Sequence, residues 1–83
     1  MERGWTPHMK ETVEVIPVGR LRRRLGGQES FWVKPGQTVD MLMAALEMDT
    51  RSVVVVVSGR RVSGEYLLRP GDEVKLLPLI SGG

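Results

Sequence analysis

The residues best suited to take part in a chemical reaction are the six at the carboxyl end, 78–83, which read Pro-Leu-Ile-Ser-Gly-Gly. Gly82 and Gly83 have no side chains, and glycine permits backbone conformations and close approaches that a Cβ forbids. We expect this end to hold out a free α-carboxylate that can enter a narrow slot in another protein. Two terminal glycines also arise by chance, and frayed chain ends commonly have no role. A functional role for the tail is therefore supported only if the elements before it hold it in place.

The stretch immediately before the tail, residues 73–78, has the alternating pattern of a β-strand and would give the tail a rigid root. Lys75 should face water, and residues two apart on a strand share a face. Leu77 and Leu79 are therefore expected on the outer face, close to the tail. Exposed leucines at such a place are candidate contacts for a partner protein. Local packing is the alternative explanation for both.

The composition indicates one small domain of 83 residues, a size that buries only about 60% of its unfolded surface. There is no cysteine, which excludes disulfides, thiolate metal sites and a thiol nucleophile. The single histidine, His8, lies in residues 1–10, which we expect to be a flexible extension. We expect no metal site, no cofactor bound by this chain and no catalytic residue, so the chain is not predicted to be an enzyme.

The charge is mildly basic, with a net value of +2 at pH 7. That is less than the asymmetry of a typical nucleic-acid-binding domain, and aromatic residues for base stacking are sparse. No apolar run approaches the length of a membrane span, and the N-terminus lacks a signal-peptide pattern. We expect a soluble cytoplasmic protein with no membrane partner.

A basic segment at residues 19–27 carries four arginines, at positions 20, 22, 23 and 24. Leu21 and Leu25 are spaced i, i+4, as on one face of a short helix that ends at Gly26. The arginines would then point away from the leucines. Such a patch could bind nucleic acid or an acidic protein surface, or it could be an ordinary solvated face.

The remaining patterns predict one helix and several strands. The helix begins at Val39, with Thr38 as its N-cap, and fades near Met48. A tight turn is expected at residues 66–68. The expected strands span residues 12–16, 28–34, 52–57, 60–62 and 73–78. This order predicts an α+β domain in which one main helix packs on one face of a mixed sheet of four to five strands. A right-handed crossover would place the last strand beside the first, in the middle of the sheet.

Four short stretches occur in an order that is similar to one known family. They are 19–22 (GRLR), 35–39 (PGQTV), 68–74 (LRPGDEV) and 77–83 (LPLISGG). With the order of elements, they resemble the β-grasp (ubiquitin-like) sulfur carriers of MoaD/ThiS type, which comprise the small subunit of molybdopterin synthase and the thiamine-biosynthesis sulfur carrier. The resemblance implies a β-grasp domain at 11–79 and a flexible tail at 80–83, containing Ile80, Ser81, Gly82 and Gly83.

Three departures from the family pattern leave the pathway open. One is the compact segment between the valine-rich strand and the last strand. The family often has Asn-Gly where this chain has Ser58 and Gly59. The molybdopterin branch favours two prolines before the tail, where this chain has Pro78 and Leu79.

The resemblance also implies a mechanism that resides in partner proteins. A ubiquitin-activating-like adenylyltransferase would use ATP to adenylate the carboxylate of Gly83. A sulfur donor would then convert the acyl-adenylate to a thiocarboxylate. The acceptor would be an enzyme such as the large subunit of molybdopterin synthase, or one of thiamine-type cofactor synthesis.

Two other functions fit the same sequence. The tail of Gly82 and Gly83 could be joined to lysines, as in a ubiquitin-like protein modifier. Alternatively, the arginines of residues 20–24 could make the domain a nucleic-acid-binding β-grasp module, in which case deleting the tail would change nothing.

Overall fold

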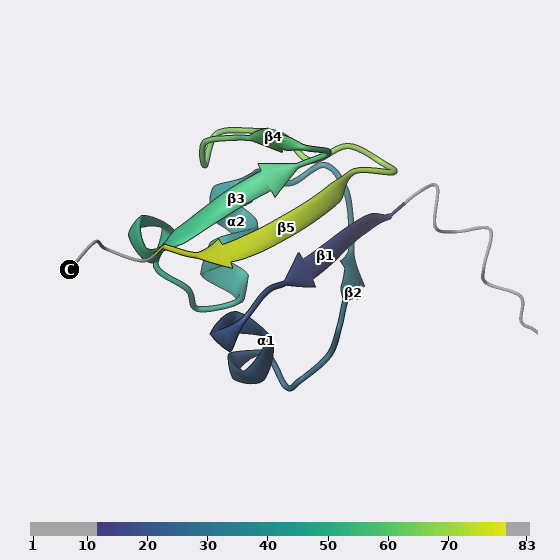
Figure 1. Cartoon of the computed structure of the whole chain (residues 1–83). Helices are drawn as coiled ribbons and strands as arrows, with labels where there is room; N and C mark the ends of the chain where they lie inside the picture. Colours follow the sequence, from purple (N-terminus) through teal and green to yellow (C-terminus); the bar gives the residue numbers. More distant parts are fainter. Residues whose placement is uncertain (1–11, 80–83) are drawn as a thin grey trace, which may run out of the picture.

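The computed structural model describes residues 12–79 as a two-layer α+β domain (Figure 1). Its elements are β1 (Val13–Pro17), α1 (Arg20–Arg24), β2 (Phe31–Val33), α2 (Val39–Ala45), the 3-10 turn η2 (Thr50–Ser52), β3 (Val53–Val57), β4 (Arg60–Arg61) and β5 (Glu73–Pro78). The five strands form one sheet in the order β2-β1-β5-β3-β4. The expected class, a mixed sheet with one main helix on one face, is confirmed.

The last strand, β5, lies in the centre of this sheet. It runs parallel to β1, with Pro17 opposite Leu76, and antiparallel to β3, with Val53 opposite Pro78. Both of its edges are thus hydrogen-bonded to neighbouring strands. A strand paired on both sides cannot fray independently of the sheet, so β5 is a firm base for the residues that follow it.

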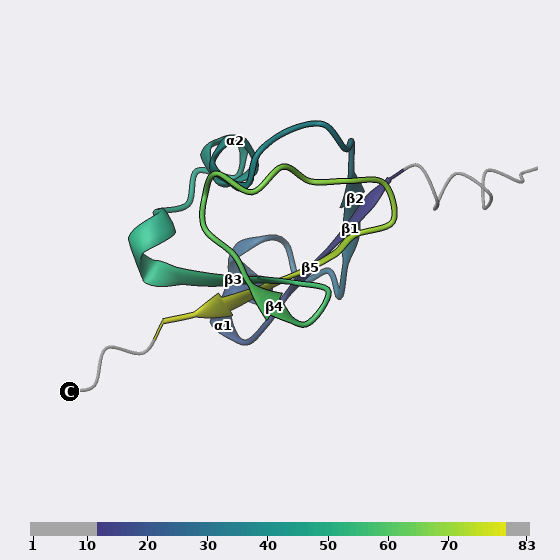
Figure 2. The same ribbon diagram turned by 90° about the horizontal axis from the view of Figure 1, so that it is seen from above.

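The core lies between the sheet and α2, which covers only one of the two sheet faces (Figure 2). From α2, Val39, Leu42 and Met43 are at most 1% exposed, which is the helical spacing that the sequence predicts. Inward-facing strand residues meet them, among them Val74 and Leu76, both fully buried. No helix among residues 12–79 is long and apolar enough to cross a membrane.

The helix α2 begins as predicted and ends earlier than predicted. The Thr38 side chain accepts a hydrogen bond from the backbone N–H of Met41 (3.2 Å), which makes Thr38 the N-cap. The helix stops at Ala45, because Glu47 adopts the left-handed conformation (φ 57°), which an α-helix cannot continue.

The prediction of a tight turn at residues 66–68 was wrong. The segment is extended and Leu67 forms a β-bridge with Thr38. Backbone pairing is the physical reason: Leu68 N–H donates to Gln37 O (2.8 Å) and Val39 N–H donates to Tyr66 O (3.0 Å). Leu68 is only 1% exposed, so the segment still covers the core.

The expected strand ends also shift. Strand β1 starts at Val13 and includes Pro17, β3 starts at Val53, and β4 stops at Arg61. The strand predicted at residues 28–34 is shorter in the structure: β2 spans only Phe31–Val33, the residues that pair with β1.

Candidate functional site

The predicted site residues divide into two groups in the structure. Leu77 and Leu79 are described, and Leu79 is the last residue that is. Ile80, Ser81, Gly82 and Gly83 lie outside the described residues, as does the extension predicted for 1–10. The structure therefore defines the root from which the tail departs.

On one side, η2 holds this root. The backbone N–H of Leu79 donates to the carbonyl oxygen of Ser52 (3.0 Å), which continues the pairing of β5 with β3 by one residue. Ser52 is itself held, because its N–H and its hydroxyl both donate to Asp49 O at 3.0 Å. A chain of hydrogen bonds thus joins η2 to the base of the tail.

Asp49 begins this chain as the N-cap of η2. Its carboxylate accepts the backbone N–H of Arg51 (2.9 Å), and the Arg51 guanidinium lies 3.5 Å away. The backbone hydrogen bond is the main cause that lowers the pKa of Asp49 below its usual 3.8, and the nearby guanidinium adds to it. The charged form of Asp49 therefore favours the turn that holds Ser52.

On the other side, Gly19 lies against the root. Its backbone has φ 64° and ψ −135°, a conformation that residues with a Cβ rarely adopt, and a Cβ there would stand 3.7 Å from Pro78 Cγ. The next connection is also backbone, since Val18 N–H donates to Leu76 O (2.9 Å). Sequence reasoning treated Gly19 only as part of a motif and missed its conformational role.

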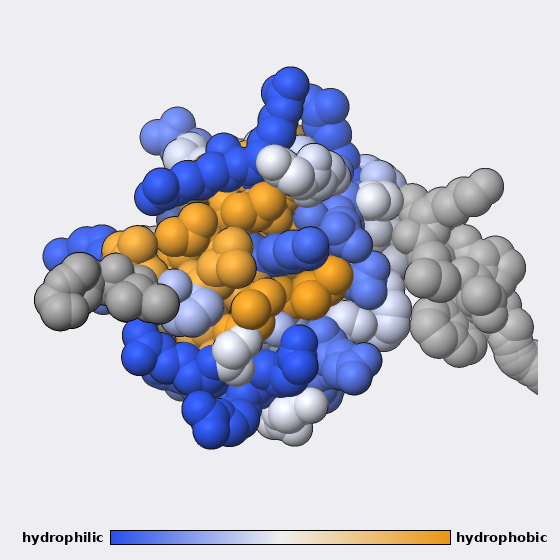
Figure 3. Space-filling view, viewed as in Figure 1, coloured by the Kyte–Doolittle hydropathy of each residue, from blue (hydrophilic) through white to orange (hydrophobic). Residues whose placement is uncertain are grey.

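The face of the sheet opposite α2 carries an apolar surface that leads to the root. Figure 3 shows this surface over β3, β5 and β1. We call it the outer apolar face; its residues are Ile16, Val54, Val56, Leu77 and Leu79. No described helix covers it.

The strand register explains why these residues gather. Leu77 pairs with Val54, and Lys75 pairs with both Val56 and Ile16, so their side chains share one face. Lys75 is exposed, whereas its neighbours on the strand, Val74 and Leu76, are fully buried. The strand parity inferred from Lys75 is thus the parity that the structure has. Leu79 is 43% exposed, a large value for a leucine.

Sequence reasoning named only two members of this face. It missed Val54 and Val56, because five consecutive valines show no alternation and so do not reveal which ones point outward. The pairing of β3 with β5 determines which of the valines point outward. It also missed Ile16, which lies across from Lys75 in the sheet.

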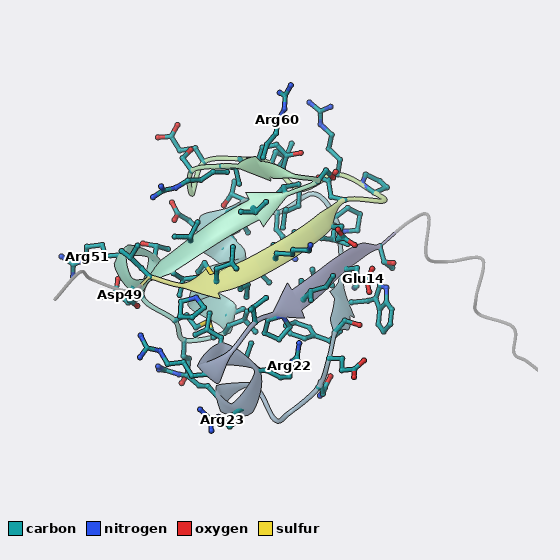
Figure 4. The ribbon with its side chains drawn as sticks, in the orientation of Figure 1. Glu14, Arg22, Arg23, Asp49, Arg51 and Arg60 are labelled. Carbon is teal, nitrogen blue, oxygen red and sulfur yellow. The ribbon has the colours of Figure 1, made fainter. Side chains whose placement is uncertain are left out.

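Charged residues border the outer apolar face. Arg61 pairs with Val56 on β3, and Lys75 lies within the face. At the end away from the tail, Glu14 lies across from Glu73 (Figure 4). Within residues 12–79 no three His, Cys, Asp or Glu side chains are grouped so as to hold a metal ion.

The fold and the tail root define the class of protein as a ubiquitin-like β-grasp protein. The sequence profile described as the ThiS family matches residues 12–83, and the chain belongs to that family. No curated protein matches the chain.

Solved structures show the same fold. The HVO 2177 protein of Haloferax volcanii is 24% identical with a TM-score of 0.70, over 87% of this chain and 86% of that one. The small archaeal modifier protein 1 of H. volcanii is 17% identical with a TM-score of 0.67, over 83% and 98%. In a complex of subunits 1 and 2 of molybdopterin-converting factor from Helicobacter pylori, one chain is 23% identical with a TM-score of 0.61, over 87% and 99%.

Proposed function

We propose that this chain is a sulfur carrier whose terminal carboxylate, on Gly83, is activated and thiolated by other proteins. Membership of the ThiS family and the order of residues 77–83 support this function. The observation that carries it is the position of β5, a central strand whose end is fixed on both sides and from which the Gly-Gly tail departs.

The chemistry begins with adenylation. An α-carboxyl group has a pKa of about 3.5, so the Gly83 carboxylate is ionised at neutral pH and needs no base to attack the α-phosphorus of ATP. Pyrophosphate leaves, and an acyl-adenylate forms. This chain supplies only the reacting group and its placement; the partner, an adenylyltransferase of the ubiquitin-activating class, binds the ATP.

Sulfur transfer completes the cycle. The terminal sulfur of a partner's persulfide attacks the acyl carbon and expels AMP. A partner thiol then cleaves the S–S bond and is oxidised to a disulfide, which leaves a thiocarboxylate on Gly83. With no cysteine in the chain, this sulfur resides only on the carboxyl carbon.

The outer apolar face is the proposed docking surface. It adjoins the root, so a partner that covers it can draw the tail into its active site while the domain stays rigid. The buried contact supplies the affinity, and Leu77 and Leu79 are its anchors nearest to the tail.

The acceptor enzyme is proposed to be of the molybdopterin or thiamine type, and the setting cytoplasmic. A large subunit like that of molybdopterin synthase is one proposed partner. The structural likeness to a chain in the H. pylori complex of subunits 1 and 2 supports such a partner.

The test is intact mass spectrometry of the purified chain after incubation with ATP, an adenylyltransferase from the same genome and a persulfide donor. The chain should gain the mass of one sulfur in place of one oxygen, and a variant lacking Gly82 and Gly83 should not. The proposal would be overturned if the full chain gained no sulfur while the same adenylyltransferase activated a carrier already known to be its substrate.

A second function, conjugation to lysines as a protein modifier, is favoured by the likeness to the small archaeal modifier protein 1. It uses the same activation of Gly83 and differs in the acceptor. Gly-Gly remnants from this tail on cellular lysines, found by proteolysis and mass spectrometry, would establish it.

A further inference from the structure

The arginines of α1 form an exposed basic patch that the fold itself does not require. Arg20, Arg23 and Arg24 follow the i, i+3, i+4 spacing of one helical face, and all three are exposed. We call them the arginine patch. Leu21, 6% exposed, belongs to the core, and Leu25, the C-cap residue of α1, packs against it.

Local electrostatics disfavour the first member of this patch. Arg20 begins α1, where the helix dipole favours negative charge, and it lies one turn from two like charges. Arg23 and Arg24 are in the last turn, where positive charge is favourable. Helix stability therefore accounts for two of the arginines and not for Arg20.

The arginine patch has no carboxylate partner among the described residues. The ion pair found among the described residues joins Arg51 to Asp49, which lie outside the patch. Arg24 meets only a backbone carbonyl, that of Glu47, at 3.5 Å. The guanidiniums of the patch are thus available to an acceptor from outside this part of the chain.

Its position is beside the root of the tail. Gly19, the residue before α1, packs against Pro78, and Val18 is hydrogen-bonded to Leu76. Figure 4 shows Arg22 and Arg23 on α1, just past the end of β1, and Arg60 at the opposite edge of the sheet. The helix α1 contacts both β1 and β5. A protein that takes in the tail must therefore come close to the arginine patch.

We propose that the arginine patch binds an acidic rim on the adenylyltransferase, beside the slot that receives the tail. This inference rests on the proposed function. Guanidinium groups suit carboxylates because their planar N–H donors can form two parallel hydrogen bonds. The patch continues the interface formed by the outer apolar face and adds charge steering to it.

A protein partner fits the surroundings better than RNA does. The arginine patch contains no aromatic side chain on which a base could stack. The net charge of +2 is also small for a domain that would bind a polyanion.

The test compares Arg20→Glu with the wild-type chain in adenylation, measured as pyrophosphate release at varied carrier concentration. The KM for the carrier should rise roughly threefold to tenfold at low salt while kcat stays unchanged, because charge reversal weakens docking and not the chemistry. The increase should shrink as salt rises from about 0.05 M to about 0.5 M.

Two measurements separate this effect from a folding defect. Arg20→Glu should not lower the midpoint of thermal unfolding and should slightly raise it, since it places negative charge at the start of α1. The matched control is Arg60→Glu, which reverses an exposed arginine on β4 and should leave the KM within about twofold.

Three outcomes would overturn the inference. One is an unchanged KM for Arg20→Glu with normal activation of the wild-type chain, which leaves the proposed function intact. Another is a KM increase that Arg60→Glu matches. A third is tight, salt-sensitive binding of a single-stranded RNA oligonucleotide that Arg20→Glu abolishes without changing the KM. Failure of the wild-type chain to be adenylated at all would overturn both proposals.

Discussion

Ser58 shows how a single residue can fit its backbone poorly. Val57 pairs with Arg60, so Ser58 and Gly59 form a two-residue hairpin loop between β3 and β4. Their φ angles are 50° and 87°, both in the left-handed region, as a type I′ turn requires. Gly59 adopts this conformation without strain, whereas serine does so at a cost.

Replacing Ser58 with asparagine should stabilise the domain. Asparagine tolerates the left-handed region better than serine, so Ser58→Asn should raise the free energy of unfolding by roughly 0.5 kcal/mol, measured by urea denaturation. Ser63→Asn is the control, because Ser63 is exposed but has no positive φ. Equal effects at both positions would show that the turn conformation is not the cause.

Leu77 and Leu76 test the two faces of β5 with the same substitution. Leu77→Asp changes a partly exposed residue of the outer apolar face, so the domain should stay folded while the KM in adenylation rises roughly tenfold or more. Leu76 is 0% exposed, and Leu76→Asp would bury a charge, so that variant should not fold.

Circular dichroism and the adenylation assay measure the two effects separately. Loss of the fold in Leu77→Asp would show that Leu77 is needed for packing, which was the alternative explanation for it. Unchanged adenylation by a folded Leu77→Asp would remove the outer apolar face from the docking surface.

At the scale of elements, η2 matters because it connects the N-cap Asp49 to the base of the tail. The hydrogen bond from Arg51 N–H lowers the pKa of Asp49 in the folded state below 3.8. Stability from this group is therefore fully present above the unfolded pKa and is lost as pH falls through the folded one.

The pH dependence of an Asp49→Asn variant should reveal this contribution. The difference in unfolding free energy between wild type and Asp49→Asn should favour the wild type near pH 7 and shrink as the pH falls through the folded-state pKa of Asp49, which lies below 3.8. The measurement is urea denaturation of both proteins at several pH values. A difference that stays constant with pH would show that the charge of Asp49 does not stabilise η2.

Sequence patterns predicted the elements that have a clear periodicity. They failed where all residues of a strand were alike, and where the conformation depends on hydrogen-bond partners that are distant in the sequence. Strand β5 was placed correctly because charged and apolar residues alternate along it. The outward-facing valines of β3 were missed because all five residues are alike. The extended course of residues 66–68 depends on backbone partners at Gln37 and Val39, which no local pattern reveals.

At the scale of the whole molecule, the sheet has two different faces, and the predicted tail follows its central strand, β5. One face packs on α2, and the other is apolar and uncovered among residues 12–79 (Figures 2 and 3). The tail follows β5, the central strand, which contributes buried residues to one face and Leu77 to the other. The tail at residues 80–83 stays a prediction from the sequence, because it lies outside the described residues, whereas the outer apolar face beside its root could be recognised only from the strand pairing.

The measurement that tests the central claim most directly is top-down mass spectrometry of two chains after complete activation and sulfur transfer. One chain ends at Gly83, and the other carries one additional alanine after it. The account predicts sulfur on the first chain, mapped to Gly83, and none on the second, because the carboxylate no longer ends a Gly-Gly pair. Sulfur elsewhere on the first chain, or equal thiolation of both chains, would contradict the account.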